Sequence, residues 1–129
     1  AAALTFMELA RAPALALETG QLLHGPMEAL SPGTALVLAR PAGEDAAALT
    51  RIAQAAVGLG LKPVLFDLSG GAPVAGAVTV PLPSRQGLAA QATLLPAAQA
   101  LVIAAAAARI GKGFGTPLRS SKVTDGEQP

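Results

Sequence analysis

One stretch of the sequence indicates the fold class. It is residues 34–68, TALVLARPAGEDAAALTRIAQAAVGLGLKPVLFDL. It opens with a continuous apolar run at 34–39, which is typical of a strand buried on both faces of a sheet. An acidic segment at 43–45 then begins a helix that runs to Gly58. A second buried strand is expected at 64–68. Because a strand, a helix and a strand follow one another, the pattern favours an α/β fold with a mainly parallel sheet.

The segments on either side extend the same architecture. A third strand is expected at 77–80, and a long apolar helix at about 88–110 follows it. Two helical segments, at 1–11 and 14–23, precede the first strand. The second of them ends at the corner His24-Gly25-Pro26, because glycine permits unusual backbone angles and proline cannot continue a helix.

Residues 86–108 carry no charged side chain over a length that could span a bilayer. Several polar side chains and a proline interrupt this segment, among them Gln86, Gln91 and Pro96. Most of the remainder is alanine, which contributes little to partitioning into lipid. We therefore expect a buried helix packed on the sheet and no membrane partner.

The composition excludes several classes of protein. The chain has 129 residues, of which 52% are hydrophobic and 13% charged, so it is too apolar for a disordered protein. Its formal net charge is +1 and its basic residues are scattered, which disfavours nucleic acid as a partner. The absence of cysteine excludes a disulfide framework and a cysteine nucleophile, and a single histidine excludes a multi-histidine metal site. We expect a cytoplasmic protein.

Three residues are candidates for chemistry, and each also has a structural explanation. Glu8 lies inside the first helical segment, where an exposed charge is the ordinary expectation. His24 stands at the corner, where it could face solvent or be a satisfied buried imidazole. Lys122 lies near the C-terminus in LRSSKVT, residues 118–124, where it could be a solvated tail residue.

Four segments resemble the sugar isomerase (SIS) domain family. They occur in the same order as in that family, and together they make the resemblance extend over nearly the full length of the chain. ALTFMEL at 3–9 is similar to that family's ALKLKEI helix, and ETGQLLHGP at 18–26 is similar to AAGELKHGP. LLPAAQAL at 94–101 and TPLRSSKVT at 116–124 are similar to the family's PLQLLA helix and PRxLxKVT tail. The resemblance is to the second SIS domain of the glucosamine-6-phosphate synthase isomerase unit and its deaminase relatives. It implies a three-layer α/β/α sandwich of flavodoxin-like type.

The resemblance also implies a role for each candidate. Glu8 takes the place of the carboxylate that shuttles a proton between C1 and C2 during aldose–ketose interconversion, which is chemistry that a positioned carboxylate can perform. His24 takes the place of the ring-opening histidine, which in the family reaches the active site of the adjoining subunit. A homodimer with a shared site is therefore implied. Lys122 is expected to belong to a tail that closes over the sugar.

Two departures from the family pattern narrow the range of expected activities. The synthase carries a catalytic lysine where this chain has Thr5, which cannot act as a cation. Aligning the terminal Val-Thr pairs puts Ser121 in the place of the synthase's Schiff-base lysine, with Lys122 one residue later. We therefore expect no glutamine-driven synthase, but an aldose–ketose isomerase or a deaminase that releases the C2 amine as ammonia.

The expected domain organisation is a C-terminal SIS domain at 1–110, lacking its first strand, and a tail at 111–129. The chain has no Ser/Thr cluster suited to a sugar phosphate, since Ser69-Gly70-Gly71 is better explained as a turn. We therefore expect an incomplete domain whose site is completed elsewhere in a two-SIS polypeptide.

The sequence-based hypothesis is a phosphosugar isomerase or aminosugar-6-phosphate deaminase that needs no metal and no organic cofactor. Its partners are a sugar phosphate and a second copy of the chain. The main alternative is a non-catalytic SIS module that binds a sugar phosphate and regulates a partner. A structural half whose site has decayed is a third possibility, for which Thr5 is the best argument.

Overall fold

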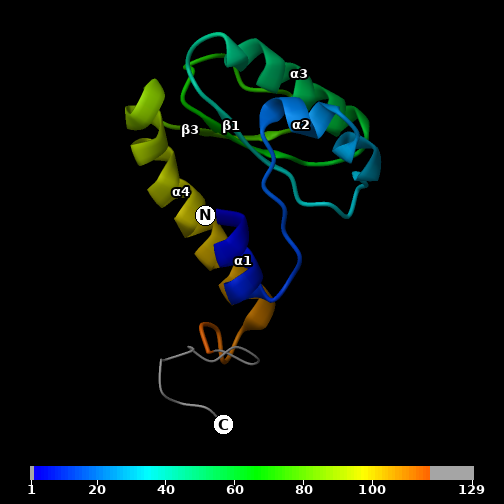
Figure 1. Ribbon diagram of the computed structural model, residues 1–129, viewed down its shortest axis with the longest axis vertical. Coiled ribbons are helices and arrows are strands. Elements are labelled where there is room, and N and C mark those ends of the chain that lie inside the picture. The colour runs from blue at the N-terminus through cyan, green and yellow to red at the C-terminus, as the bar shows by residue number, and fades with distance from the viewer. Residues whose placement is uncertain (1, 117–129) are drawn as a thin grey trace, which may run out of the picture. The chain divides into compact units, whose positions relative to one another are not determined.

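A computed structural model describes residues 2–116 of the chain (Figure 1). The helices are α1 (Ala2–Ala10), α2 (Thr19–Leu23), the 3-10 helix η1 (Pro26–Ala29), α3 (Asp45–Gly58) and α4 (Gly87–Ile110). The strands are β1 (Val37–Arg40), β2 (Val64–Asp67) and β3 (Val78–Pro81). Residues 17–98 form one compact unit, here the sheet unit. Residues 2–16 and 99–116 belong to a second, here the helical unit.

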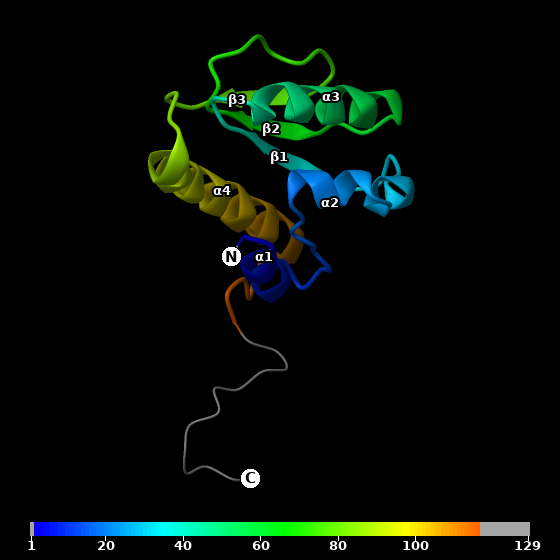
Figure 2. The ribbon, with the colours of Figure 1, turned by 45° about the horizontal axis from the view of Figure 1, so that its top comes forward.

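The sheet has three strands in the order β1-β2-β3, and both pairs are parallel. The α/β fold with a parallel sheet is thus confirmed. Helix α3 connects β1 to β2 and lies along the sheet (Figure 2). The register pairs Val37 with Val64 and places Arg40 beside Asp67 at the carboxyl ends of the two strands.

Apolar side chains from α2, α3, two strands and the connection after β2 form the core of the sheet unit. Ile52 on α3 and Leu65 on β2 are 2% and 0% exposed, and Leu22 of α2 joins the same cluster. The other buried members are Leu38, Leu49, Ala53 and Val74. At about 25 cal/mol per Å² of apolar surface removed from water, this cluster is the main source of stability in the unit.

The connection between β2 and β3 contains no helix and packs directly against α3. A Cβ atom built on Gly76 would lie 2.6 Å from Cγ1 of Val57, and the backbone of Gly76 has a φ of +82°. Glycine is the residue that tolerates both conditions, since it has no Cβ and adopts positive φ readily. This close approach lets Val74, on the same connection, reach the core.

In the helical unit, two arginines join α1 to the end of α4. Arg109 Nε donates to the carbonyl oxygen of Ala10 at 3.0 Å, which satisfies a backbone acceptor at the C-terminal end of α1. Arg11 Nη2 donates to the carbonyl oxygens of Gly113 and Thr116 at 3.4 and 2.8 Å. Figure 1 shows α1 beside the C-terminal part of α4.

The structure corrects three sequence-based predictions. Residues 14–18 are not helical, and α2 begins only at Thr19, where the backbone N–H of Glu18 donates to Gln21 Oε1 at 3.1 Å. The first strand is not buried on both faces, because burial alternates along it: Leu38 and Arg40 are buried, whereas Val37 on the other face is 49% exposed.

The third correction concerns α4, which is not a buried helix in this chain: 6% of its most apolar window is buried. The core of the sheet unit is formed by α2, α3, the strands and the connection after β2, and no residue of α4 belongs to that cluster. Within residues 2–116, α4 is the one helix long and apolar enough to cross a membrane, a test that core helices of soluble proteins also pass.

Candidate functional site

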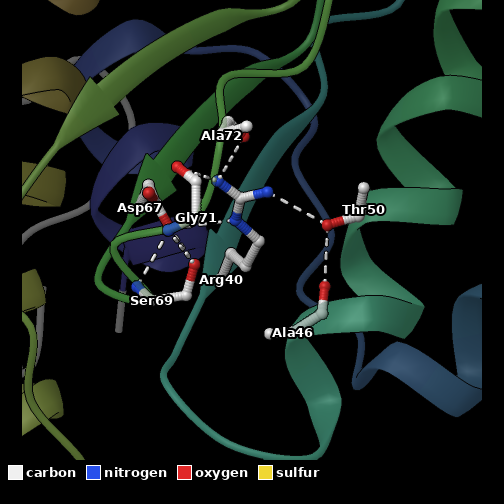
Figure 3. Close-up of polar contacts among 7 residues, drawn as sticks. All are labelled: Arg40, Ala46, Thr50, Asp67, Ser69, Gly71 and Ala72. Carbon is white, nitrogen blue, oxygen red and sulfur yellow. Dashed lines mark hydrogen bonds and ion pairs between the residues drawn. The ribbon is translucent and has the colours of Figure 1, made fainter.

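A buried ion pair occupies the carboxyl edge of the sheet (Figure 3). Arg40 Nε donates to Asp67 Oδ1 at 2.9 Å, and both side chains are 4% exposed. The remaining guanidinium nitrogens donate to Thr50 Oγ1 on α3 at 3.0 Å and to the carbonyl oxygens of Gly71 and Ala72 at 3.3 and 3.0 Å. Arg40 therefore ties both strands, the helix and the loop after β2 together.

The Asp67 carboxylate is held by a second set of donors. The backbone N–H and the hydroxyl of Ser69 both donate to Oδ1, at 2.9 and 2.6 Å. Burial by itself raises the pKa of Asp67, but the hydrogen bonds from Arg40 and Ser69 outweigh it, so the pKa lies below its ordinary value. The carboxylate is thus charged at neutral pH and satisfied by neighbouring groups.

Sequence reasoning missed this pair, although a signal was present. Each of the two apolar strands ends in a charged residue, Arg40 or Asp67, and a parallel register brings strand ends to one edge of the sheet. The same site explains the role of Ser69 in its turn. Its hydroxyl accepts from the Gly71 N–H at 3.1 Å and donates to Asp67, so the Ser69-Gly70-Gly71 turn is structural, as expected.

An open pocket of about 320 Å³ lies in the sheet unit, near the end of β1. Apolar walls come from β1, α3 and the N-terminal part of α4, and the polar side chains of Thr19, Asp45 and Gln91 also line it. Neither Glu8 nor His24 is part of its lining. Among the described residues, no group of His, Asp and Glu could hold a metal ion.

The structure places Glu8 on α1, in the helical unit, with an exposed side chain. Within residues 2–116, this carboxylate makes no hydrogen bond and no ion pair. Its position as a helical, solvent-accessible carboxylate is compatible with proton transfer to a ligand. It is equally the position of an ordinary surface charge.

His24 caps the C-terminal end of α2 in the sheet unit, where its backbone N–H donates to the Gln21 carbonyl at 3.2 Å. The imidazole is exposed and has no hydrogen-bond partner in the described part of the chain. The next residue, Gly25, has a φ of +130°, which turns the chain into η1. The predicted corner is therefore confirmed. Lys122 lies outside the described residues.

The sequence matches no family model and no curated protein. Among solved structures, the chain is similar to the C-terminal domain of glucosamine-fructose-6-phosphate aminotransferase from Francisella tularensis, with a TM-score of 0.77 and 20% sequence identity. The chain shares the SIS fold. The similarity covers 91% of this chain and 33% of that structure, so this chain spans about a third of the length of the protein it matches.

This likeness confirms the SIS-type α/β fold expected from the four sequence segments. At 20% identity it is a likeness of fold and does not carry the catalytic residues with it. Glu8, His24 and Lys122 therefore stay predictions about chemistry. The boundary expected at residue 110 stays a prediction as well.

Proposed function

We propose that the chain is the SIS portion of a phosphosugar isomerase or of an aminosugar-6-phosphate deaminase. The observation that carries the proposal is the likeness of fold to the C-terminal domain of glucosamine-fructose-6-phosphate aminotransferase. The helix with Glu8 and the glycine-proline corner with His24 support it, because both residues stand where the SIS resemblance expects an acid/base group.

In this function, Glu8 removes a proton from C2 of the open-chain aldose and returns it to C1, which produces the ketose through an enediol-like intermediate. A carboxylate suits this exchange because it can accept and release the same proton within hydrogen-bond reach of both carbons. In the deaminase reaction, the same proton transfer from C2 to C1 produces an imine at C2; water adds to this imine, the amine leaves as ammonia, and the ketose keeps the oxygen of the water at C2. In both reactions C1 is reduced as C2 is oxidised within the same molecule, so no redox partner is required.

His24 opens the sugar ring by moving a proton between the C1 hydroxyl and the ring oxygen. Imidazole can donate and accept a proton near neutral pH, as this step requires. We propose that His24 acts in the site of a second copy of the chain, so that the working unit is a homodimer. Lys122 belongs to the tail that closes over the sugar, and the protein acts in the cytoplasm without a metal or organic cofactor.

The test is turnover by the full-length protein that contains this chain. With glucosamine 6-phosphate and fructose 6-phosphate as substrates, Glu8→Gln is expected to reduce kcat by about 10²- to 10⁴-fold, the contribution typical of a general acid–base group. Glu44→Gln is the matched control, because Glu44 is an exposed glutamate in the sheet unit without a side-chain hydrogen bond within residues 2–116.

Wild-type turnover in Glu8→Gln would contradict the proposal. Calorimetric binding of either sugar phosphate without isomerisation or ammonia release would instead favour a non-catalytic SIS module. An unchanged melting temperature in Glu8→Gln shows that a loss of turnover is not a loss of folding.

A further inference from the structure

The 320 Å³ open pocket of the sheet unit is lined by three polar side chains, of which Thr19 is half-buried and Asp45 and Gln91 are exposed. Thr19 begins α2, Asp45 begins α3, and Gln91 lies in the first part of α4. Within residues 2–116, none of these three side chains has a hydrogen-bond or ion-pair partner. We propose that this pocket binds a small uncharged organic molecule with an apolar body and one hydroxyl or amide group. The proposal is independent of the proposed function, whose acid/base residues lie outside the pocket.

The walls of the pocket suit an apolar body. Leu49 and Leu68 are 6% and 1% exposed, so they are held by the core, and Leu94 of α4 faces the same space. Small-molecule sites are typically clefts of about 300–1,000 Å³ with apolar walls and a few convergent polar groups. This pocket is at the lower end of that range, so it fits a ligand with a single ring. The carboxyl end of a parallel sheet is also where α/β folds commonly bind ligands.

The charges around the pocket favour a neutral ligand. Two long helices, α3 of 14 residues and α4 of 24, have N-terminal residues in the lining, Asp45 and Gly87. Each helix N-terminus is equivalent to about half a positive charge, so the two together offset about one negative charge. The Asp45 carboxylate supplies that charge. No lysine, arginine or histidine lines the pocket.

Asp45 is therefore the specificity-determining residue of this pocket. Helix N-termini by themselves attract anions, because their free N–H groups and their dipoles point at the ligand. A carboxylate in the same lining opposes a second negative charge. Asp45 can still accept a hydrogen bond from a hydroxyl or amide, and Thr19 and Gln91 can both donate and accept.

The test uses three probes of similar size that differ in charge. Benzyl alcohol, benzylamine and benzoate are titrated into the full chain at pH 7, and binding is followed by NMR. Benzyl alcohol is expected to bind with a Kd on the order of millimolar, as suits a ligand of about eight heavy atoms. Benzylamine and benzoate are expected to bind more weakly, because their charges must be desolvated without a net opposite charge.

Two matched pairs of variants locate the site and its charge. Leu94→Trp fills the pocket and is expected to abolish binding of benzyl alcohol, whereas Leu95→Trp alters a neighbouring side chain that is 46% exposed and outside the lining. Asp45→Asn is expected to tighten benzoate binding by roughly two- to fivefold, which is the effect of a helix terminus on one charge. Glu28→Gln, which removes an exposed carboxylate on η1 outside the lining, is expected to leave benzoate binding unchanged.

Wild-type binding of benzyl alcohol by a folded Leu94→Trp chain would overturn the proposal, as would benzoate binding as tightly as benzyl alcohol to the unmodified chain. If Leu94→Trp does not fold, amide shifts of the unmodified chain decide. Perturbations confined to Thr19, Asp45 and Gln91 and their neighbours support the site, and perturbations elsewhere refute it.

Discussion

Helices α3 and α4 both carry apolar side chains, yet only those of α3 enter the core of the sheet unit. In the sheet unit, Ile52 is 2% exposed and contributes to a core made by α2, α3, the strands and the connection after β2. In α4, Ile103 is 48% exposed and Leu88 is 82% exposed. Hydropathy alone therefore does not create a core, because burial requires other elements packed against the apolar surface.

The largest expected effect is at the ion pair that closes the sheet unit. Arg40→Met removes the cation that pairs with the Asp67 carboxylate, whose side chain is only 4% exposed. The unpaired buried charge is expected to lower the free energy of unfolding by on the order of 3–5 kcal/mol. Urea denaturation measures this loss. Arg51→Met is the control, because Arg51 is an exposed arginine on α3 without a side-chain partner within residues 2–116.

A loss below about 1 kcal/mol in Arg40→Met would show that the pair contributes no more than an exposed one. The double variant Arg40→Met/Asp67→Leu sharpens the result. It removes both charges, and it is expected to recover much of the lost stability because no buried charge is left unpaired.

The next-largest effect comes from an isoleucine-to-alanine substitution, made once in α3 and once in α4. Ile52→Ala is expected to cost about 2–5 kcal/mol, since it removes buried methyl groups and leaves a cavity in the core. Ile103→Ala is expected to change the free energy of unfolding by less than about 0.5 kcal/mol, because its side chain is half exposed and alanine favours helix. Equal losses in the two variants would mean that α4 is as well buried as α3.

A smaller effect comes from pH. The pKa of Asp67 is lower in the folded chain than its ordinary value, so the charged carboxylate stabilises the fold above that ordinary value, about 3.9. This stability is lost as pH falls below about 4 and through the folded pKa. Melting temperatures measured between about pH 3 and 7 are expected to fall at the acid end, and less so in the variant Asp67→Asn. An identical acid slope in both proteins would contradict the assignment.

The elements that sequence reasoning located well are those with strong local signals. An acidic start and an apolar period predict α3, and Pro26 after Gly25 predicts the corner at the end of α2. Residues 14–18 were misassigned because their apolar composition resembles a helix, whereas the helix begins only where Gln21 can accept from the Glu18 N–H. The exposure of α4 could not be predicted, because it depends on which other elements pack against it.

The candidate site was predicted to a smaller extent. The positions of Glu8 on a helix and His24 at a corner follow from the sequence, and so does the structural turn at Ser69. The Arg40–Asp67 pair and the pocket with Asp45 were not predicted, because each depends on which strand ends and helix starts meet. Such contacts arise from register and topology, which local patterns specify only weakly.

The two proposed catalytic groups belong to different units of the chain: Glu8 lies in the helical unit and His24 in the sheet unit. The most direct test is subunit complementation in the full-length protein. Glu8→Gln and His24→Asn are expected to be inactive alone on fructose 6-phosphate and glucosamine 6-phosphate. Coexpression of the two is expected to restore about a quarter of wild-type activity, because half of the dimers are mixed and each mixed dimer has one intact shared site. Full activity in either single variant, or no recovery in the mixture, would contradict a site built from Glu8 and the second copy's His24.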